Sequence, residues 1–149
     1  MDLPDTAADV AIASDHAGFA LKDMLVRLLA EDGRSVHDLG TDDAATSVDY
    51  PDFGRACAEM VAAGRAAFGI VVCGSGIGIS IAANRVPGAR CALVHDHLSA
   101  RLAREHNDAN MIALGARLTG VETAVDAVRI FLATPFAGGR HQRRIDKLG

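Results

Sequence analysis

The sequence predicts a three-layer α/β/α, Rossmann-like domain with a five-stranded parallel sheet and a C-terminal helical extension. Short apolar runs alternate with stretches whose apolar residues have helical spacing, which is typical of repeated strand–helix units. The run FGIVVC is uninterrupted, as expected of a strand covered on both faces. No linker, repeat or low-complexity segment breaks the alternation, so we expect a single domain over residues 1–149.

Strand and helix segments follow one another in a regular order. The expected strands are DVAIAS at 9–14, SVHDLG at 35–40, FGIVVC at 68–73, ARCALV at 89–94 and NMIALG at 110–115. The amphipathic helices that follow them span 18–31, 50–64, 76–84, 98–107 and 120–134. Gly33 ends the first helix, Pro51 stands near the start of the second, and Pro135 ends the fifth. The polar stretch 41–49 is an expected loop, and 138–149 is a short terminal segment.

The composition fits a soluble globular protein and excludes several classes. Of the 149 residues, 50% are apolar and 23% are charged, and the formal net charge is -4. This charge argues against a nucleic-acid-binding protein. No apolar run approaches the roughly 18 residues of a membrane span, so we expect no membrane partner. The acidic stretch MDLPDTAADV lacks the features of a signal peptide, which predicts a cytoplasmic location.

The cysteines are odd in number and far apart, which fits neither a disulfide framework nor a paired metal site. Cys57 falls within a predicted helix and Cys91 within a predicted strand, so we assign both to packing. Cys73 ends the third strand and precedes a glycine turn. Such a thiol is either an inert core residue or a base or nucleophile, because the positive end of the next helix stabilises a thiolate.

Three alternating glycines mark the turn from the third strand to the third helix. Gly74, Gly76 and Gly78 leave backbone N–H groups facing outward at a helix N-terminus, which favours an anion. A dinucleotide fingerprint would need glycine where Ile79 stands, although Asp96 lies about 20 residues on, as that motif requires. A P-loop is excluded, because no Gly-Lys-Ser/Thr sequence follows the glycines.

Other polar residues are expected at the carboxyl edge of the sheet, where ligands bind in open parallel sheets. Asp15 and His16 follow the first strand and can handle protons at neutral pH, or form an N-cap beside a surface histidine. His106 and Asn107 end the fourth helix, where a histidine also complements the helix dipole. The HDH stretch at 95–97 has no third ligand at a recognisable spacing, so we expect no metal.

The chain ends in the cationic stretch RHQRRIDKLG. Arg140 and Arg144 are four residues apart and share a helix face, where two guanidinium groups can clamp a phosphate. Arg143 points elsewhere, and the cations also suit the negative end of a terminal helix. Because a Pro-Phe-Ala-Gly-Gly break precedes them, we expect residues 135–149 to form an arm that reaches a neighbour's site.

Five long motifs, SDHAGFALK, DYPDF, VVCGSGIGISIAANR, HDHLSARLAREHNDANMIALGAR and GGRHQRR, follow one another over roughly residues 9–146. In this order they resemble the type B ribose-5-phosphate isomerases and their relatives that act on other sugar phosphates. The resemblance implies an enzyme that interconverts ribose 5-phosphate and ribulose 5-phosphate through an enediolate, without a metal or organic cofactor. It also implies a homodimer, or a dimer of dimers, whose active sites are shared between subunits.

The resemblance further assigns a role to each matching residue. Cys73 would be the base that moves a proton between C1 and C2, and Ser75 with the amides of the glycine loop would stabilise the enediolate oxygen. His106, with Asp15 nearby, would open the sugar ring. The sugar contacts would be Tyr50 and Asn107, and the phosphate ligands would be His16, Arg117, Arg140 and Arg144, the last two from the partner.

One position separates two styles of chemistry within this family. Some members have a glutamate base one position after the third loop glycine, where this chain has Ile79. Isoleucine cannot accept a proton, so cysteine-based chemistry is predicted. Two alternatives stay open: isomerisation of allose or galactose 6-phosphate or of erythrulose 4-phosphate, and a non-catalytic nucleotide-binding module based on the glycine loop and Asp96.

Overall fold

A computed structural model describes residues 7–149 of the chain. The first six residues of the predicted domain, and with them most of the acidic stretch that argued against a signal peptide, lie outside the described residues. None of the described helices is long and apolar enough to cross a bilayer.

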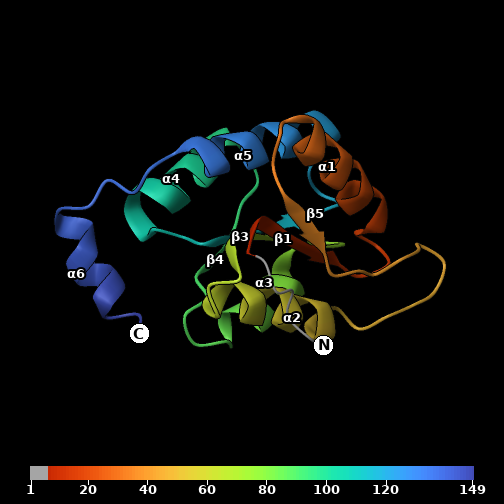
Figure 1. Ribbon diagram of the computed structural model, residues 1–149, viewed down its shortest axis with the longest axis horizontal. Helices are drawn as coiled ribbons and strands as arrows, with labels where there is room; N and C mark the ends of the chain where they lie inside the picture. Colours follow the sequence, from red (N-terminus) through yellow and green to blue (C-terminus); the bar gives the residue numbers. More distant parts are fainter. Residues whose placement is uncertain (1–6) are drawn as a thin grey trace.

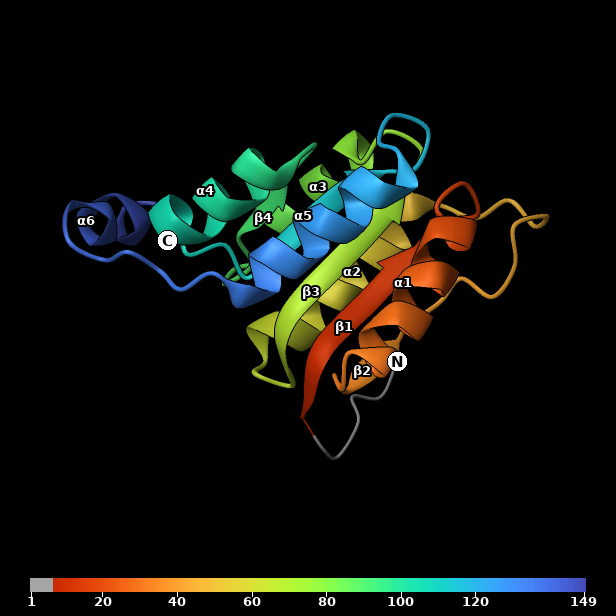
Figure 2. The ribbon, with the colours of Figure 1, turned by 90° about the horizontal axis from the view of Figure 1, so that it is seen from above.

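Five parallel strands form one sheet, as the sequence predicted (Figure 1). They are β1 (Ala8–Ser14), β2 (Val36–Asp38), β3 (Ala66–Cys73), β4 (Cys91–Leu93) and β5 (Met111–Gly115). Their spatial order is β2-β1-β3-β5-β4, which no sequence pattern had indicated. The two longest strands, β1 and β3, therefore lie side by side near the middle of the sheet (Figure 2).

Helices cover both faces of the sheet, which confirms the three-layer fold class (Figures 1 and 2). On one face lie α1 (Phe19–Glu31), α4 (His97–Asn107) and α5 (Val121–Ala133). On the other lie α2 (Tyr50–Ala62) and α3 (Ile77–Asn84). The short helix α6 (Arg140–Asp146) stands outside these layers, beyond the end of α4.

Alternation along the central strands builds two hydrophobic cores, one for each face of the sheet. In β1, Val10 and Ile12 enter the core beneath α1, α4 and α5, while Ala11 and Ala13 enter the core beneath α2 and α3. All four side chains are fully buried. The period-2 geometry of a strand sends successive side chains to opposite faces, so a continuous apolar run is what a doubly covered strand requires.

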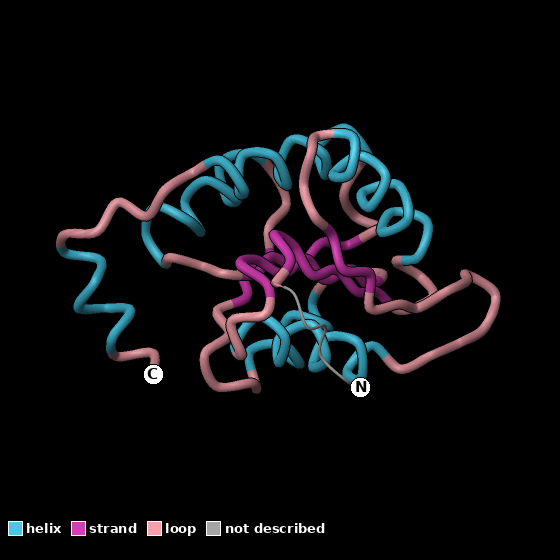
Figure 3. The backbone as a smooth tube through the Cα atoms, in the orientation of Figure 1, coloured by secondary structure: helices cyan, strands magenta, loops and turns pink. Residues whose placement is uncertain are grey.

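The strand order reverses between β1 and β3, and this reversal positions the site. From β1 the chain goes outward to β2 on one side, and from β3 onward it occupies the other side. Ligands of doubly wound sheets bind where the connections diverge in this way. Because Ser14 pairs with Val72, the residues that follow β1 emerge beside Cys73. The predicted loop at 41–49 extends from the same edge (Figure 3).

Candidate active site

A cavity of about 650 Å³ lies at this carboxyl edge. Eight of the residues that the sequence singled out line it: Asp15, His16, Tyr50, Cys73, Gly74, Ser75, Gly78 and Arg117. They come from three strand ends and the start of α2, so the fold gathers side chains from distant parts of the sequence into one place.

Cys73, the last residue of β3, lies under the first turn of α3. The backbone N–H of Gly76 donates a hydrogen bond to its Sγ over 3.1 Å. Gly76 adopts a φ of 78°, and a Cβ there would lie 2.8 Å from the carbonyl carbon of Leu114, so only glycine fits. The turn therefore aims an N–H group at the sulfur, at the N-terminal end of α3.

The loop after β5 braces the glycine loop. The N–H groups of Ala116 and Arg117 donate to the carbonyls of Cys73 and Gly74, each over 2.9 Å. The Arg117 guanidinium lies against Gly74, where a Cβ would be 3.3 Å from Nη1. Ser75 accepts the N–H of Ile77 through its Oγ. Arg117 has no carboxylate partner within residues 7–149, so its charge is available to an anion in the cavity.

Asp15 and His16 are both held by local hydrogen bonds. One oxygen of the buried Asp15 carboxylate accepts the N–H of Gly18 over 3.0 Å and closes the turn before α1. The N-cap of α1 is Gly18, without a side-chain cap, so Asp15 is not the N-cap that was considered. His16 Nδ1 accepts the N–H of Val48 over 3.2 Å, so the neutral ring carries its proton on Nε2. The loop at 41–49, which supplies Val48, thereby fixes the tautomer of a cavity residue.

Tyr50 closes one side of the cavity by lying over Gly78. A Cβ at Gly78 would be 2.5 Å from Cζ and 2.9 Å from Oη of Tyr50. This close approach explains why the third loop position is glycine although its backbone is helical. The ring is 41% exposed, so it can move away without disturbing the core.

A Gly78→Ala variant is expected to push the Tyr50 ring out of the cavity at little cost in stability. Because Tyr50 is a predicted sugar contact, KM for a sugar-phosphate substrate should rise about 10-fold, the worth of roughly one hydrogen bond. Steady-state kinetics and a thermal melt measure both effects. Gly120→Ala is the matched control, since nothing lies within 4 Å of a Cβ at that position. An unchanged KM in Gly78→Ala would remove Tyr50 from the site.

The other predicted residues, His106, Asn107, Arg140 and Arg144, do not line this cavity. Helix α4 starts at the carboxyl edge and runs back, so His106 and Asn107 at its end lie near the opposite edge. Its 11 residues span roughly 16 Å. Within one chain, therefore, the structure does not bring His106 near Asp15, and their pairing stays a prediction that needs a second copy.

Helix α6 joins the arginine pair to the end of α4. The imidazole rings of His106 and His141 stack with centroids 4.4 Å apart and an interplanar angle of 16°. Arg140 and Arg144 are exposed and have no carboxylate partner among the described residues. Arg143 and Arg144 lie in the last turn of α6, where they suit the helix dipole, but Arg140 is its first residue. The dipole therefore does not account for Arg140.

The stack is expected to loosen as the pH falls. Burial lowers the pKa of His141 below 6.5, and His106, Arg140 and Arg144 lower it further, against an opposing effect of Glu105. The folded protein thus binds this proton less readily than the unfolded chain, so the stabilising effect of a neutral His141 is lost as pH falls below about 6.5. The protection of the Ala137 amide, which donates to the Glu105 carbonyl, should fall between pH 7.5 and 5.5 once exchange is corrected for its intrinsic rate at each pH. A His141→Phe variant should abolish this dependence, and its persistence there would contradict the account.

The remaining candidates have structural partners. Cys57 and Cys91 are buried in the core, as assigned, and burial raises the pKa of the Cys57 thiol to about 12. The Asp96 carboxylate accepts the Ser99 N–H over 2.7 Å in a capping box that starts α4, which accounts for the acid that a nucleotide site would need. His97 contacts Asp126 over 2.9 Å. Residues 7–149 contain no cluster of three potential metal ligands.

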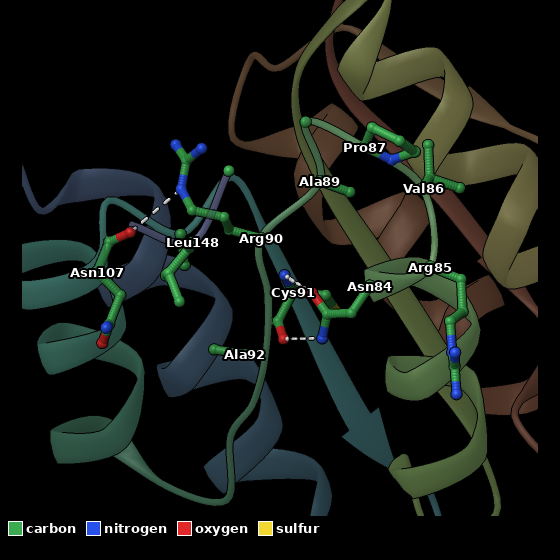
Figure 4. A pocket seen from close by; sticks show the side chains of 13 residues that line it. Asn84, Arg85, Val86, Pro87, Ala89, Arg90, Cys91, Ala92, Asn107 and Leu148 are labelled. Carbon is green, nitrogen blue, oxygen red and sulfur yellow. Dashed lines mark hydrogen bonds between the residues drawn. The ribbon is translucent and has the colours of Figure 1, made fainter. Parts of the chain in front are cut away.

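A second cavity, of about 630 Å³, lies beside the edge strand β4 (Figure 4). The Asn84 side chain donates to the carbonyl of Cys91 and accepts its N–H, each over 2.8 Å, as another strand would. Arg90 donates to the backbone carbonyls of Asn107 and Asp108. These polar groups already have partners, so the cavity offers no obvious ligand site. Asn107 lines this cavity and not the one that contains Cys73.

Sequence reasoning missed three apolar side chains at the rim of the first cavity. Ile77, Ile81 and Leu118 are 51%, 53% and 63% exposed. Ile77 and Ile81 are four residues apart on α3 and so share one face, and that spacing was the available signal. The His106–His141 stack was also not predicted, because its two residues are 35 positions apart in the sequence, in α4 and α6.

Comparison with known proteins places the chain in a family. The ribose/galactose isomerase family model matches residues 10–148. The chain belongs to this ribose/galactose isomerase family. It is 42% identical to ribose-5-phosphate isomerase B of Escherichia coli, with 93% of each chain covered.

Solved structures agree with this placement. The ribose-5-phosphate isomerase B of Clostridium thermocellum superposes with a TM-score of 0.92 at 49% identity, covering 94% of both chains. That of Mycoplasma genitalium, solved with bound ribulose 5-phosphate, gives a TM-score of 0.90 at 40% identity, covering 93% of this chain and 92% of its own. The resemblance inferred from the motifs is confirmed, and this ribose/galactose isomerase family member is an enzyme, a sugar-phosphate isomerase.

Proposed function

We propose that the enzyme interconverts ribose 5-phosphate and ribulose 5-phosphate through an enediolate, with Cys73 as the base. One observation carries the proposal. The Gly76 N–H lies 3.1 Å from Cys73 Sγ, inside a cavity that also presents Asp15, His16 and Arg117. A base, hydrogen-bond donors and a cation thus face one space. The names of the Escherichia coli and Clostridium thermocellum relatives, and the ligand of the Mycoplasma genitalium relative, support the substrate.

The chemical step follows from these groups. The Cys73 thiolate removes the proton from C2 of the open-chain aldose, the C–H electron pair forms the C1–C2 double bond, and the carbonyl electrons move to O1. Ser75 and the amides of the glycine loop stabilise the negative charge on O1, each donor contributing about 3 kcal/mol. The thiol then returns the proton to C1, and the hydroxyl proton moves from O2 to O1, which leaves the ketose.

A second copy of the chain completes this site. His106, Asn107, Arg140 and Arg144 form a unit at the far end of α4, held together by the His106–His141 stack. In a two-fold dimer each chain lends this unit to its partner's cavity, because an isologous interface exchanges equivalent surfaces. The exposed Ile77, Ile81 and Leu118 beside the cavity gain burial in such a contact.

The completed site holds both ends of the substrate. The partner's His106, with Asp15, moves a proton from the O1 hydroxyl to the ring oxygen and so opens the sugar ring. Tyr50 and the partner's Asn107 contact the sugar hydroxyls. His16, Arg117 and the partner's two arginines bind the phosphate, and this remote binding energy positions C2 against the thiolate.

Turnover on sugar phosphates of different length tests the proposal. Phosphates of four-, five- and six-carbon sugars are assayed with the same preparation, together with a nucleotide in calorimetry. The proposal expects the highest kcat/KM with the five-carbon pair. A higher kcat/KM with an allose, galactose or erythrulose phosphate would reassign the substrate, and tight nucleotide binding without turnover would reject the enzyme activity altogether.

A further inference from the structure

Lys22 is a buried charge that the proposed chemistry does not use. Its side chain is 1% exposed, in the first turns of α1. The ammonium lies 2.7 and 2.8 Å from the two carboxylate oxygens of Asp38, at the end of β2. A buried ammonium without a partner is strongly unfavourable. Replacing a buried ion pair, both partners together, by apolar side chains is often neutral for stability. Stability alone is therefore a weak explanation for this pair.

A series of hydrogen bonds connects the Asp38 carboxylate to the end of β1. Its Oδ1 also accepts the N–H of Gly40 over 2.9 Å. The Gly40 carbonyl accepts the N–H of Ser14 over 2.8 Å, and the Thr41 N–H donates to the Ser14 carbonyl over 2.9 Å. Both backbone groups of Ser14 are thus held by the segment that the ion pair anchors. Ser14 directly precedes Asp15 and His16.

Lys22 also holds the other end of this loop. Its own N–H donates to the Gly18 carbonyl over 2.9 Å, and the Gly18 N–H donates to Asp15 Oδ1 over 3.0 Å. A Cβ at Gly18 would lie 2.5 Å from the Val72 carbonyl oxygen, so the turn packs tightly on β3, one residue before Cys73. The loop from Asp15 to Gly18 is therefore tied on one side to the Asp38–Thr41 segment and on the other to the first turn of α1.

We propose that Lys22 and Asp38 are a positioning pair, which fixes Asp15 and His16 against the Cys73 thiolate by joining α1 to the end of β2. The inference rests on the proposed function for its kinetic readout. Neither side chain touches the substrate cavity, so their effect passes through Ser14, Gly18 and the loop between them.

A Lys22→Met variant tests the pair, because methionine keeps the length of the side chain and removes the ammonium. Small misplacements of catalytic groups lower rates steeply, so kcat/KM should fall about 10-fold to 100-fold. The Ser14 and Thr41 amides should exchange faster, and the NMR signals of the His16 ring should shift. Asp38→Asn, on the more exposed partner, serves as the second variant if Lys22→Met does not fold.

Leu25→Ala is the matched control. Leu25 lies in the same helix as Lys22 and is fully buried, so shortening its side chain leaves a cavity in the core. All variants are assayed well below their melting temperatures. The proposal expects Leu25→Ala to lose stability but to keep wild-type kcat/KM, His16 signals and Ser14 protection. The proposal is overturned if Lys22→Met also keeps wild-type kcat/KM, His16 signals and Ser14 protection. It is equally overturned if Leu25→Ala loses these three properties to the same extent as Lys22→Met.

Failure of the proposed function gives a different result. If the wild-type enzyme turns over no sugar phosphate, the amide exchange and the His16 signals still report on the loop. Faster exchange and shifted signals in Lys22→Met alone then support the positioning pair, and unchanged exchange and signals overturn it.

Discussion

Replacing Cys73 with alanine is expected to lower kcat by about 10³-fold, within the range of general acid–base catalysis. The variant keeps the glycine loop, the phosphate ligands and the cavity, so KM should change by less than about threefold. The expectation depends on the position of Sγ in the cavity, where the Gly76 N–H donates to it over 3.1 Å. Steady-state kinetics with ribose 5-phosphate measure both constants.

Cys91→Ala is the control for the loss of a buried thiol. Cys91 lies in the same core as Cys73, and burial raises its pKa, so it supplies no thiolate at neutral pH. Its replacement should leave kcat within about twofold of the wild-type value. Substantial turnover in Cys73→Ala would show that another group removes the C2 proton, and Ile79 cannot be that group.

Reversing the charge at Arg140 and Arg144 together is expected to raise KM by at least about 10²-fold, with a smaller effect on kcat. Each guanidinium contributes a charge-assisted hydrogen bond to the phosphate, worth about 1.5–3 kcal/mol. Glutamates at these positions would also repel the dianion. The measurement is KM for ribose 5-phosphate together with the inhibition constant of inorganic phosphate, which should weaken in parallel.

Arg143→Glu is the control, because it reverses one charge on the same helix, half the charge change of the double variant. Arg143 is adjacent to Arg144, so the two side chains point about 100° apart around the helix, and Arg143 is also exposed. Its reversal should raise KM by no more than about threefold, the effect of a screened surface charge. Equal increases in the single Arg143 variant and the double variant would indicate general electrostatic attraction in place of a clamp.

Most of the fold followed from local patterns. Each predicted strand and helix lies within three residues of its observed bounds, because doubly covered strands and amphipathic helices each leave a distinct periodicity. The order of the strands in the sheet could not be predicted from local patterns, since it depends on which strands pair with each other across the sheet. The carboxyl-edge rule did gather Asp15, His16, Cys73 and Arg117 correctly, because that rule needs only the order of strands and helices along the chain.

The rest of the site lay beyond sequence reasoning for a physical reason. His106 lies in the last turn of α4, a helix that runs away from the carboxyl edge, so a single chain does not bring it near Asp15. The Lys22–Asp38 pair joins residues 16 apart through a bend that no local pattern encodes. Ile79 illustrates the opposite case, because the family resemblance marked its position as one that can carry a base, and an isoleucine there cannot accept a proton.

The sharing of each site between two chains is tested most directly by mixing two inactive variants. Cys73→Ala and His106→Ala are co-expressed with different tags, and the doubly tagged dimers are purified. Each mixed dimer contains one site with both substitutions and one site with neither, so half of its sites are intact. Before purification, random pairing makes half of the dimers mixed, so about a quarter of all sites are intact. We predict recovery of turnover close to half the wild-type value per purified mixed dimer, against almost none for either variant alone. Mixed dimers that stay as inactive as their parents would contradict the shared site, because Cys73 and His106 would then act within one chain.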